Sequence, residues 1–190
     1  MSSSTPDAGG RGARELSSRR ITAAVRELYW RININLPDDV LAALRRARDE
    51  ETSERAADIL DQLLENQEVS RSENIPLCQD TGTAVAFVFV GQQLCITGES
   101  VEEAVSRGIA EACERYPLRR SMVEGPLERA NTRDNTPAIV HLRQVAGREL
   151  TLHLLAKGGG AENMSRLSML SPGDGREGIV SAAVDTVRDA

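Results

Sequence analysis

The apolar positions of the chain follow two different periods, and the change falls near Ile75-Pro76. Before that point apolar residues recur every three or four positions, which is the spacing of one helix face. This spacing predicts helices within residues 15–69, the second of which opens at Pro37, where a missing N–H costs nothing. The residues predicted to face inward are Leu16, Val25, Leu28 and Tyr29, then Val40, Leu41, Leu44 and Ala47, then Ala56, Ile59, Leu60, Leu63 and Leu64. We expect these segments to be packing elements rather than sites of chemistry.

After Ile75-Pro76 the pattern predicts strands as well as helices. Residues 83–90 are β-branched and aromatic, which favours a buried strand, and 94–97 follow as a short strand after a turn. Ser100 and Glu103 have the spacing of a capping box and predict a helix start. The residues of that helix predicted to be buried are Val101, Ala104, Val105, Ile109 and Ala112.

The last third of the chain predicts two more strands and a helix. Residues 138–145 and 149–156 alternate, and the turn between them at 146–148 predicts a hairpin. A final helix begins at about Arg176, with Ile179, Val180, Ala183, Val184 and Val187 inward. The chain therefore predicts an α+β fold, an N-terminal helical subdomain packed on a mixed sheet with antiparallel hairpins and flanking helices.

The two ends of the chain differ from its middle. Residues 1–14 are small, polar and Gly/Ser-rich, so we expect a disordered tail, and Asp7 argues against a second interpretation as an organelle-targeting signal. The remaining residues, 15–190, form the expected domain. Its last helix stops at Ala190 without a Gly or Asn cap, which predicts a domain incomplete at its C-terminal end.

Composition excludes several classes of function. No stretch approaches the ~18 apolar residues of a membrane-spanning helix, so we expect no membrane association. The chain carries 23 basic and 29 acidic residues and few aromatic ones, which argues against a nucleic-acid partner. Three cysteines are an odd, sparse set, which favours free thiols and a reducing, cytoplasmic location.

Cys78 is the first candidate for chemistry, because it lies in a polar loop, 76–82, directly before an apolar strand. As a thiolate it could be a nucleophile or a metal ligand, although neither histidine is close in sequence, and an incidental Cys in a turn is the alternative. Cys95 and Cys113 match no metal-binding spacing and are expected to be buried structural thiols. His141 and His153 lie in strands and receive no role.

Two further segments could bind anions. Lys157 precedes three glycines whose N–H groups could surround an anion, although a flexible exit from the strand explains them equally well. The paired arginines of 119–123 could clamp a carboxylate, because a guanidinium matches a carboxylate in two places, or could form a solvated surface. The polar turn 131–137 is interpreted as scaffold.

Three of these segments occur together in the order PLCQDTGTAV, LRRSMVEGPLERANTRDNTPAIVH and LAKGGGAENMSRLSMLSPGDGREGI. In this order and spacing they resemble the α region of the class I iron–sulfur hydro-lyases, the oxygen-sensitive fumarate hydratases and L(+)-tartrate dehydratases. The run RELYWRININLPDDVLAALRRARDEE resembles that family's N-terminal helices, so the similarity covers roughly residues 20–190.

The resemblance implies a fumarate hydratase class I-type enzyme that adds water to and removes it from a small dicarboxylate, with fumarate/malate first and tartrate next. It implies a [4Fe–4S] cluster held by three cysteines, whose open iron acts as a Lewis acid. By position, Cys78 matches the family's first cluster ligand. Gln79 and Asp80 match residues that reach the substrate. Arg119 matches the arginine that pairs with a substrate carboxylate, and Gly160 matches a backbone contact to the substrate. The resemblance also implies a β region or β subunit as partner and a dimeric assembly.

This chain departs from the family pattern in its cysteines. The family's second cluster cysteine follows the helix at which this sequence stops, and neither Cys95 nor Cys113 lies in a matching motif. Only one of the three expected ligands is therefore present, no catalytic residue is assigned, and we expect the isolated chain to be inactive. The alternative is a non-catalytic dicarboxylate-binding or assembly module derived from the same family.

Overall fold

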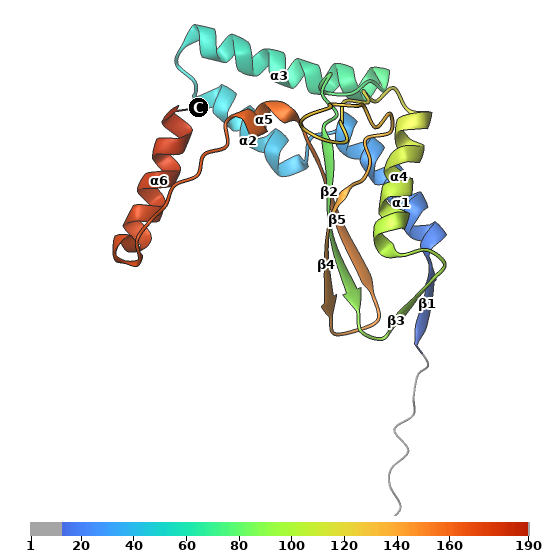
Figure 1. Ribbon diagram of the computed structural model, residues 1–190. Coiled ribbons are helices and arrows are strands. Elements are labelled where there is room, and N and C mark those ends of the chain that lie inside the picture. The colour runs from blue at the N-terminus through green and yellow to red at the C-terminus, as the bar shows by residue number, and fades with distance from the viewer. Residues whose placement is uncertain (1–12, 190) are drawn as a thin grey trace, which may run out of the picture.

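A computed structural model describes residues 13–189 of the chain (Figure 1). Its elements in chain order are β1 (Arg14–Ser17), α1 (Ser18–Ile34), α2 (Asp38–Glu50), α3 (Glu54–Glu73), β2 (Thr83–Gly91), β3 (Leu94–Thr97), α4 (Val101–Arg115), β4 (Ile139–Val145), β5 (Leu150–Lys157), α5 (Gly159–Asn163), η1 (Pro172–Asp174) and α6 (Gly175–Asp189). The expected α+β class is confirmed, since helices flank a mixed sheet. Of the expected tail, residues 1–12 lie outside the described part, whereas Arg14 already belongs to β1.

The central sheet corrects the predicted hairpin. Strands β4 and β5 do not pair with each other but flank β2, in the order β4-β2-β5. The segment between β4 and β5 crosses the end of β2, where the Gly91 N–H donates to the Glu149 carbonyl at 2.8 Å. The chain does turn at 146–148, between β4 and β5. These strands pair with β2 instead of each other, because β2 is the most apolar strand and gains hydrogen bonds on both edges in the middle of the sheet.

A second, smaller sheet replaces the predicted start of the first helix. Strand β1 pairs in parallel with β3, and Leu16 lies opposite Ile96. The prediction that Leu16 belongs to a helix face was therefore wrong. Leu16 pairs with β3, which lies far away in the sequence and could not be identified from the local pattern.

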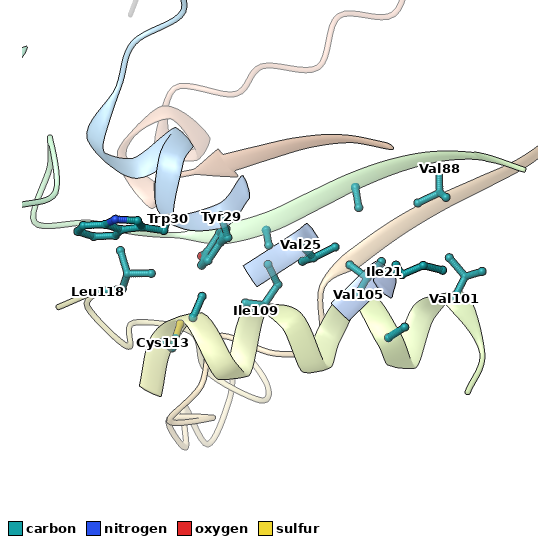
Figure 2. Close-up of a cluster of buried hydrophobic side chains, with 14 of the residues drawn as sticks. Ile21, Val25, Tyr29, Trp30, Val88, Val101, Val105, Ile109, Cys113 and Leu118 are labelled. Atoms are coloured by element: carbon teal, nitrogen blue, oxygen red, sulfur yellow. The ribbon is translucent and has the colours of Figure 1, made fainter. Parts of the chain in front are cut away.

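The core lies between one face of the sheet and helices α1 and α4 (Figure 2). On β2, Ala84, Ala86 and Val88 are fully buried, while Phe87 on the opposite face is exposed. All five residues predicted to be buried on α4 are buried. Gly108 lets α4 approach α1 closely, because a Cβ at this position would lie 2.7 Å from the Thr22 carbonyl oxygen.

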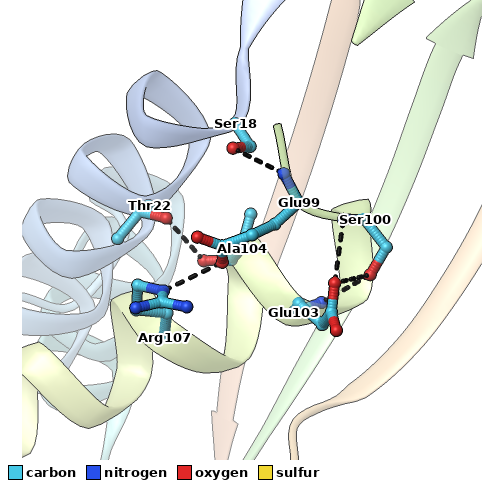
Figure 3. Close-up of polar contacts among 7 residues, drawn as sticks. All are labelled: Ser18, Thr22, Glu99, Ser100, Glu103, Ala104 and Arg107. Carbon is cyan, nitrogen blue, oxygen red and sulfur yellow. Dashed lines mark hydrogen bonds and ion pairs between the residues drawn. The ribbon is translucent and has the colours of Figure 1, made fainter. Parts of the chain in front are cut away.

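Hydrogen bonds fix the start of α4 against α1 (Figure 3). The predicted capping box is confirmed, since the Glu103 N–H donates to Ser100 Oγ at 3.2 Å and the Ser100 N–H donates to Glu103 Oε2 at 3.0 Å. The N–H and the hydroxyl of Ser100 both donate to the Glu103 carboxylate and lower its pKa. Ser18 Oγ accepts from the Glu99 N–H at 3.1 Å, and Thr22 Oγ1 donates to the Ala104 carbonyl at 3.1 Å.

Helices α2 and α3 pack on each other rather than deep in the core. Helix α2 begins after Pro37, as predicted, but none of its residues is buried. On α3, two of the residues predicted to face inward are largely exposed, Ile59 at 51% and Leu63 at 45%. The helix is instead tied to the end of α1 by a buried amide, because Gln67 Oε1 accepts from the Leu36 N–H at 2.6 Å.

Helix α6 forms where it was predicted, but its apolar face is not buried. Ile179 is 62% exposed and Val187 is 76% exposed. Among residues 13–189, α6 packs mainly against η1, and Figure 1 shows it standing apart from the sheet. The amphipathic pattern identified the helix correctly, but it could not identify a packing partner. No helix in the described part of the chain is both long and apolar enough to cross a membrane.

A pair of isoleucines tests this division between core and surface. Ile109→Ala empties a fully buried position on α4, and we expect it to lower the free energy of unfolding by about 2–5 kcal/mol in urea denaturation followed by circular dichroism. Ile179→Ala on α6 makes the same chemical change at an exposed position and should cost under about 0.5 kcal/mol. Equal losses would show that the α6 face is packed.

Candidate functional site

The sheet topology brings three segments from distant parts of the sequence to one edge. Loop 74–82 precedes β2, segment 116–138 precedes β4, and turn 158–160 follows β5. Because β4 runs parallel to β2 while β5 runs antiparallel, the starts of β2 and β4 and the end of β5 lie at the same edge. Thr83, the first residue of β2, lies opposite Lys157, the last of β5.

Asp80 connects all three segments. Its Oδ2 accepts a hydrogen bond from the Gly159 N–H at 2.8 Å, and its Oδ1 accepts one from Ser121 Oγ at 3.3 Å. The neighbouring Thr81 hydroxyl is buried and accepts from the Arg119 N–H at 3.0 Å. Two adjacent residues of one loop therefore hold the other two segments in place.

Gly82 allows the turn after β5 to approach this loop. It has a left-handed backbone conformation with φ +68°, and a Cβ there would lie 2.0 Å from the Lys157 carbonyl oxygen. A side chain at Gly82 would push the two segments apart. Gly158 lies beside the Asp80 carboxylate, where a hypothetical Cβ would be 3.2 Å from Oδ2.

Cys78 lies exposed at the edge of this network. Its Sγ accepts from the Asp80 N–H at 3.4 Å, and its thiol lies 3.5 Å from Gln79 Oε1. The Leu77 N–H donates to the Asn33 carbonyl at 2.8 Å, which anchors the loop on α1.

A cavity of about 440 Å³ brings four of the five predicted site residues together. Its lining includes Cys78, Gln79, Asp80 and Gly160.

Arg119, the fifth predicted residue, lines an adjoining cavity of about 400 Å³ that shares Asp80 as a wall. Arg129 and Lys157 also line it. The Arg119 side chain is exposed. The two arginines of this lining favour an anionic ligand beside them.

Sequence reasoning located most of this site but missed several of its members. It assigned no role to Ser121 or Arg129, and it treated Arg119 and Arg120 as a pair. The structure separates that pair, because Arg120 Nη2 donates to the Cys113 carbonyl at 3.0 Å and so braces α4. Ser121 could have been found, because it directly follows the two arginines. Arg129 could not, because nothing in its local sequence predicts its left-handed backbone, with φ 54°.

The other two thiols lie away from this cavity's lining. Cys113 is buried, as predicted, and burial raises its pKa to about 11. Cys95 was predicted to be buried but is exposed, since it takes an outward position in β3. Strand β3 follows the far end of β2, whereas the candidate site lies at its start (Figure 1).

These residues do not by themselves form the ligand set of an iron–sulfur cluster. Within residues 13–189, no group of three or more His, Cys, Asp and Glu side chains is arranged to hold a metal ion. The site offers one accessible thiol, which fits a single cluster ligand and not three.

The fold and the site together place the exposed thiol of Cys78 beside cavities lined by arginine, lysine and aspartate at the edge of a mixed sheet. A family described as fumarate hydratase (Fumerase) matches residues 22–190, and the chain belongs to that family. The resemblance inferred from the motifs is thereby confirmed.

Relatives in this family carry related names. A Methanocaldococcus jannaschii protein, provisionally named L(+)-tartrate dehydratase subunit alpha, is 35% identical over 90% of this chain and 62% of its own length. L(+)-tartrate dehydratase subunit alpha of Escherichia coli strain UTI89 is 29% identical over 88% of this chain and 56% of its own length. The K12 strain protein of the same name is 28% identical over the same shares. The chain thus spans about three fifths of the relatives that it matches.

Thiol labelling tests the different environments of the cysteines. In the native chain at pH 7.5, we expect N-ethylmaleimide to modify the exposed Cys78 and Cys95 within minutes and to leave Cys113 unmodified until denaturant is added. Burial keeps Cys113 protonated until the pH approaches its pKa of about 11, so raising the pH to 9 should not release it. Cys95→Ser should leave one fast-reacting thiol by mass spectrometry. Two fast thiols in that variant would contradict the structure.

Proposed function

We propose that this chain contributes the carboxylate-binding half of a hydro-lyase site, in which water is added to or removed from a small dicarboxylate. Fumarate/malate is the first substrate pair that we propose, and tartrate the next. The observation that supports this most is the meeting of Cys78, Gln79 and Asp80 with Arg119 and the 158–160 turn, in a chain of the fumarate hydratase family.

Arg119 is suited to bind one substrate carboxylate. Its backbone is fixed on both sides, because its N–H donates to Thr81 Oγ1 at 3.0 Å and its carbonyl accepts from Asn135 Nδ2 at 2.8 Å. The guanidinium is left to form the two parallel hydrogen bonds that a carboxylate accepts.

Residues on the other side of Asp80 are suited to orient the remainder of the substrate. The Gln79 amide can donate to and accept from a hydroxyl or carboxylate, and the Gly160 backbone lines the same cavity. The Asp80 carboxylate, held by Ser121 and Gly159, can accept a hydrogen bond from a substrate hydroxyl.

A [4Fe–4S] cluster, when bound, would supply a Lewis acid for the leaving or entering water. Cys78 would be this chain's ligand to it, and Cys95 and Cys113 would not take part. We therefore propose that the isolated chain has no hydro-lyase activity and that it acts with a β region or β subunit. The relatives named as subunit alpha support such a partner.

The presence of only one thiol, Cys78, in the lining of the described cavity also supports a second candidate, a non-catalytic dicarboxylate-binding or assembly module. The two proposals agree on anion binding and differ on the cluster.

Binding of succinate, a non-reactive dicarboxylate, tests the anion site that both proposals share. We expect calorimetric titration of the full chain to show succinate binding tighter than acetate binding. Arg119→Gln should weaken succinate binding about tenfold, because one charge-assisted contact is lost. Arg46→Gln removes the same charge from the exposed face of α2 and should change the dissociation constant less than twofold. Equal effects of the two variants would contradict a site at Arg119.

Cluster reconstitution separates the two proposals. After anaerobic treatment with iron and sulfide, we expect the 190-residue chain alone to show no stable cluster absorbance and no turnover of fumarate, malate or either tartrate enantiomer. Cluster absorbance and turnover should both appear when a tartrate dehydratase β-type partner and the remaining cysteine ligands are supplied. Cys78→Ser in that complex should abolish the absorbance and the turnover. A stable, active cluster on the chain alone would overturn the first proposal, and succinate binding without any cluster in the complex would favour the module.

A further inference from the structure

Asn135 is a buried polar residue that lines neither of the two cavities. It is fully buried beneath the segment that carries Arg119, and its backbone adopts the left-handed conformation with φ 59°. Among residues with a side chain, Asn is one of the few that tolerate this conformation.

The Asn135 side chain is fully satisfied. Its Oδ1 accepts from the N–H groups of Ser121 and Met122 at 2.8 and 3.1 Å. Its Nδ2 donates to the Arg119 carbonyl at 2.8 Å and approaches Cys113 Sγ at 3.6 Å. Both acceptor and both donor positions of the amide are therefore filled, and three of the four partners belong to one short segment.

The segment held in this way contributes two residues to the lining of this cavity. Arg119 lines it, and Ser121 also donates its hydroxyl to Asp80 Oδ1. Asn135 is itself fixed by the preceding Asp134, whose Oδ1 accepts from the Thr136 N–H at 3.0 Å.

We propose that Asn135 is a positioning residue, which sets the place of the Arg119 guanidinium by holding the backbone of residues 119–122 against α4. The ligand in this proposal is the dicarboxylate, so that part rests on the proposed function. The geometric part, that Asn135 orders residues 119–122, stands without it.

The chain offers a matched control in Asn131. Its Nδ2 donates to the Arg120 carbonyl at 2.8 Å and its Oδ1 accepts from the Arg133 N–H at 2.7 Å, but it is exposed. Asn131→Gly and Asn135→Gly therefore remove the same side chain from the same region, and glycine accepts the left-handed backbone of Asn135.

Hydrogen exchange of the full chain tests the geometric part. In Asn135→Gly we expect the Ser121 and Met122 amides to exchange at least about tenfold faster, as each loses a buried acceptor, while the Ile109 amide in α4 keeps its protection. Asn131→Gly should leave the Ser121 and Met122 rates unchanged. Unchanged Ser121 and Met122 rates in folded Asn135→Gly would overturn the proposal.

A second variant covers the case in which the glycine variant unfolds. Asn135→Asp keeps both acceptor bonds, but it replaces Nδ2 by an oxygen that faces the Arg119 carbonyl and adds a buried charge. We therefore expect Ser121 and Met122 to stay protected while succinate binding weakens.

Succinate titration tests the consequence for binding. The dissociation constant, corrected to the folded fraction, should rise about tenfold in Asn135→Gly and less than threefold in Asn131→Gly. An unchanged constant in folded Asn135→Gly would make Asn135 a stability residue only and overturn its positioning role. If the unmodified chain does not bind succinate, the proposed function fails, and the exchange rates still decide whether Asn135 orders the segment.

Discussion

The position of β2 between a parallel β4 and an antiparallel β5 is the constraint on which the candidate site depends. Only this arrangement places the loop before β2, the segment before β4 and the turn after β5 at one edge. The register is set by burial, because Ala84, Ala86 and Val88 face α1 and α4 while Phe87 faces outward. A slip of one residue would exchange these faces. Packing along β2 therefore decides which groups meet at its start.

The site is held by polar groups that are themselves satisfied, which favours a preorganised geometry. Asp80 joins loop 74–82 to the other two segments through one oxygen each. Asn135 provides a second, buried connection beneath Arg119. The thiol of Cys78 and the side chain of Arg119 are exposed, the first held by the Asp80 N–H and the second carried on a backbone fixed by Thr81. This ordering of exposed groups supports the proposed binding of a small dicarboxylate.

Much of the fold could be predicted because its signals are local. Pro37 and the Ser100–Glu103 capping box act over one helical turn, and both helix starts were predicted correctly. The buried face of α4 followed from its periodicity. The hairpin between β4 and β5 was wrong because strand pairing is decided by the partner that buries most apolar surface, and that partner, β2, lies about fifty residues earlier in the chain. The burial predicted for Cys95 and for the apolar face of α6 was also wrong, because burial depends on tertiary partners that the local sequence does not specify.

The sequence by itself determined the helices, the apolar strand β2 and the chemical identity of the candidate groups: a thiol, a carboxylate, an arginine and a glycine-rich turn. The tertiary structure alone decided that Asp80 meets Ser121, 41 residues away, and Gly159, 79 residues away. It also decided that Arg119 serves the cavity while Arg120 braces α4. The physical reason is that propensities and caps act between neighbours in sequence, whereas the pairing of strands and the burial of side chains act between whatever segments the folded chain brings into contact.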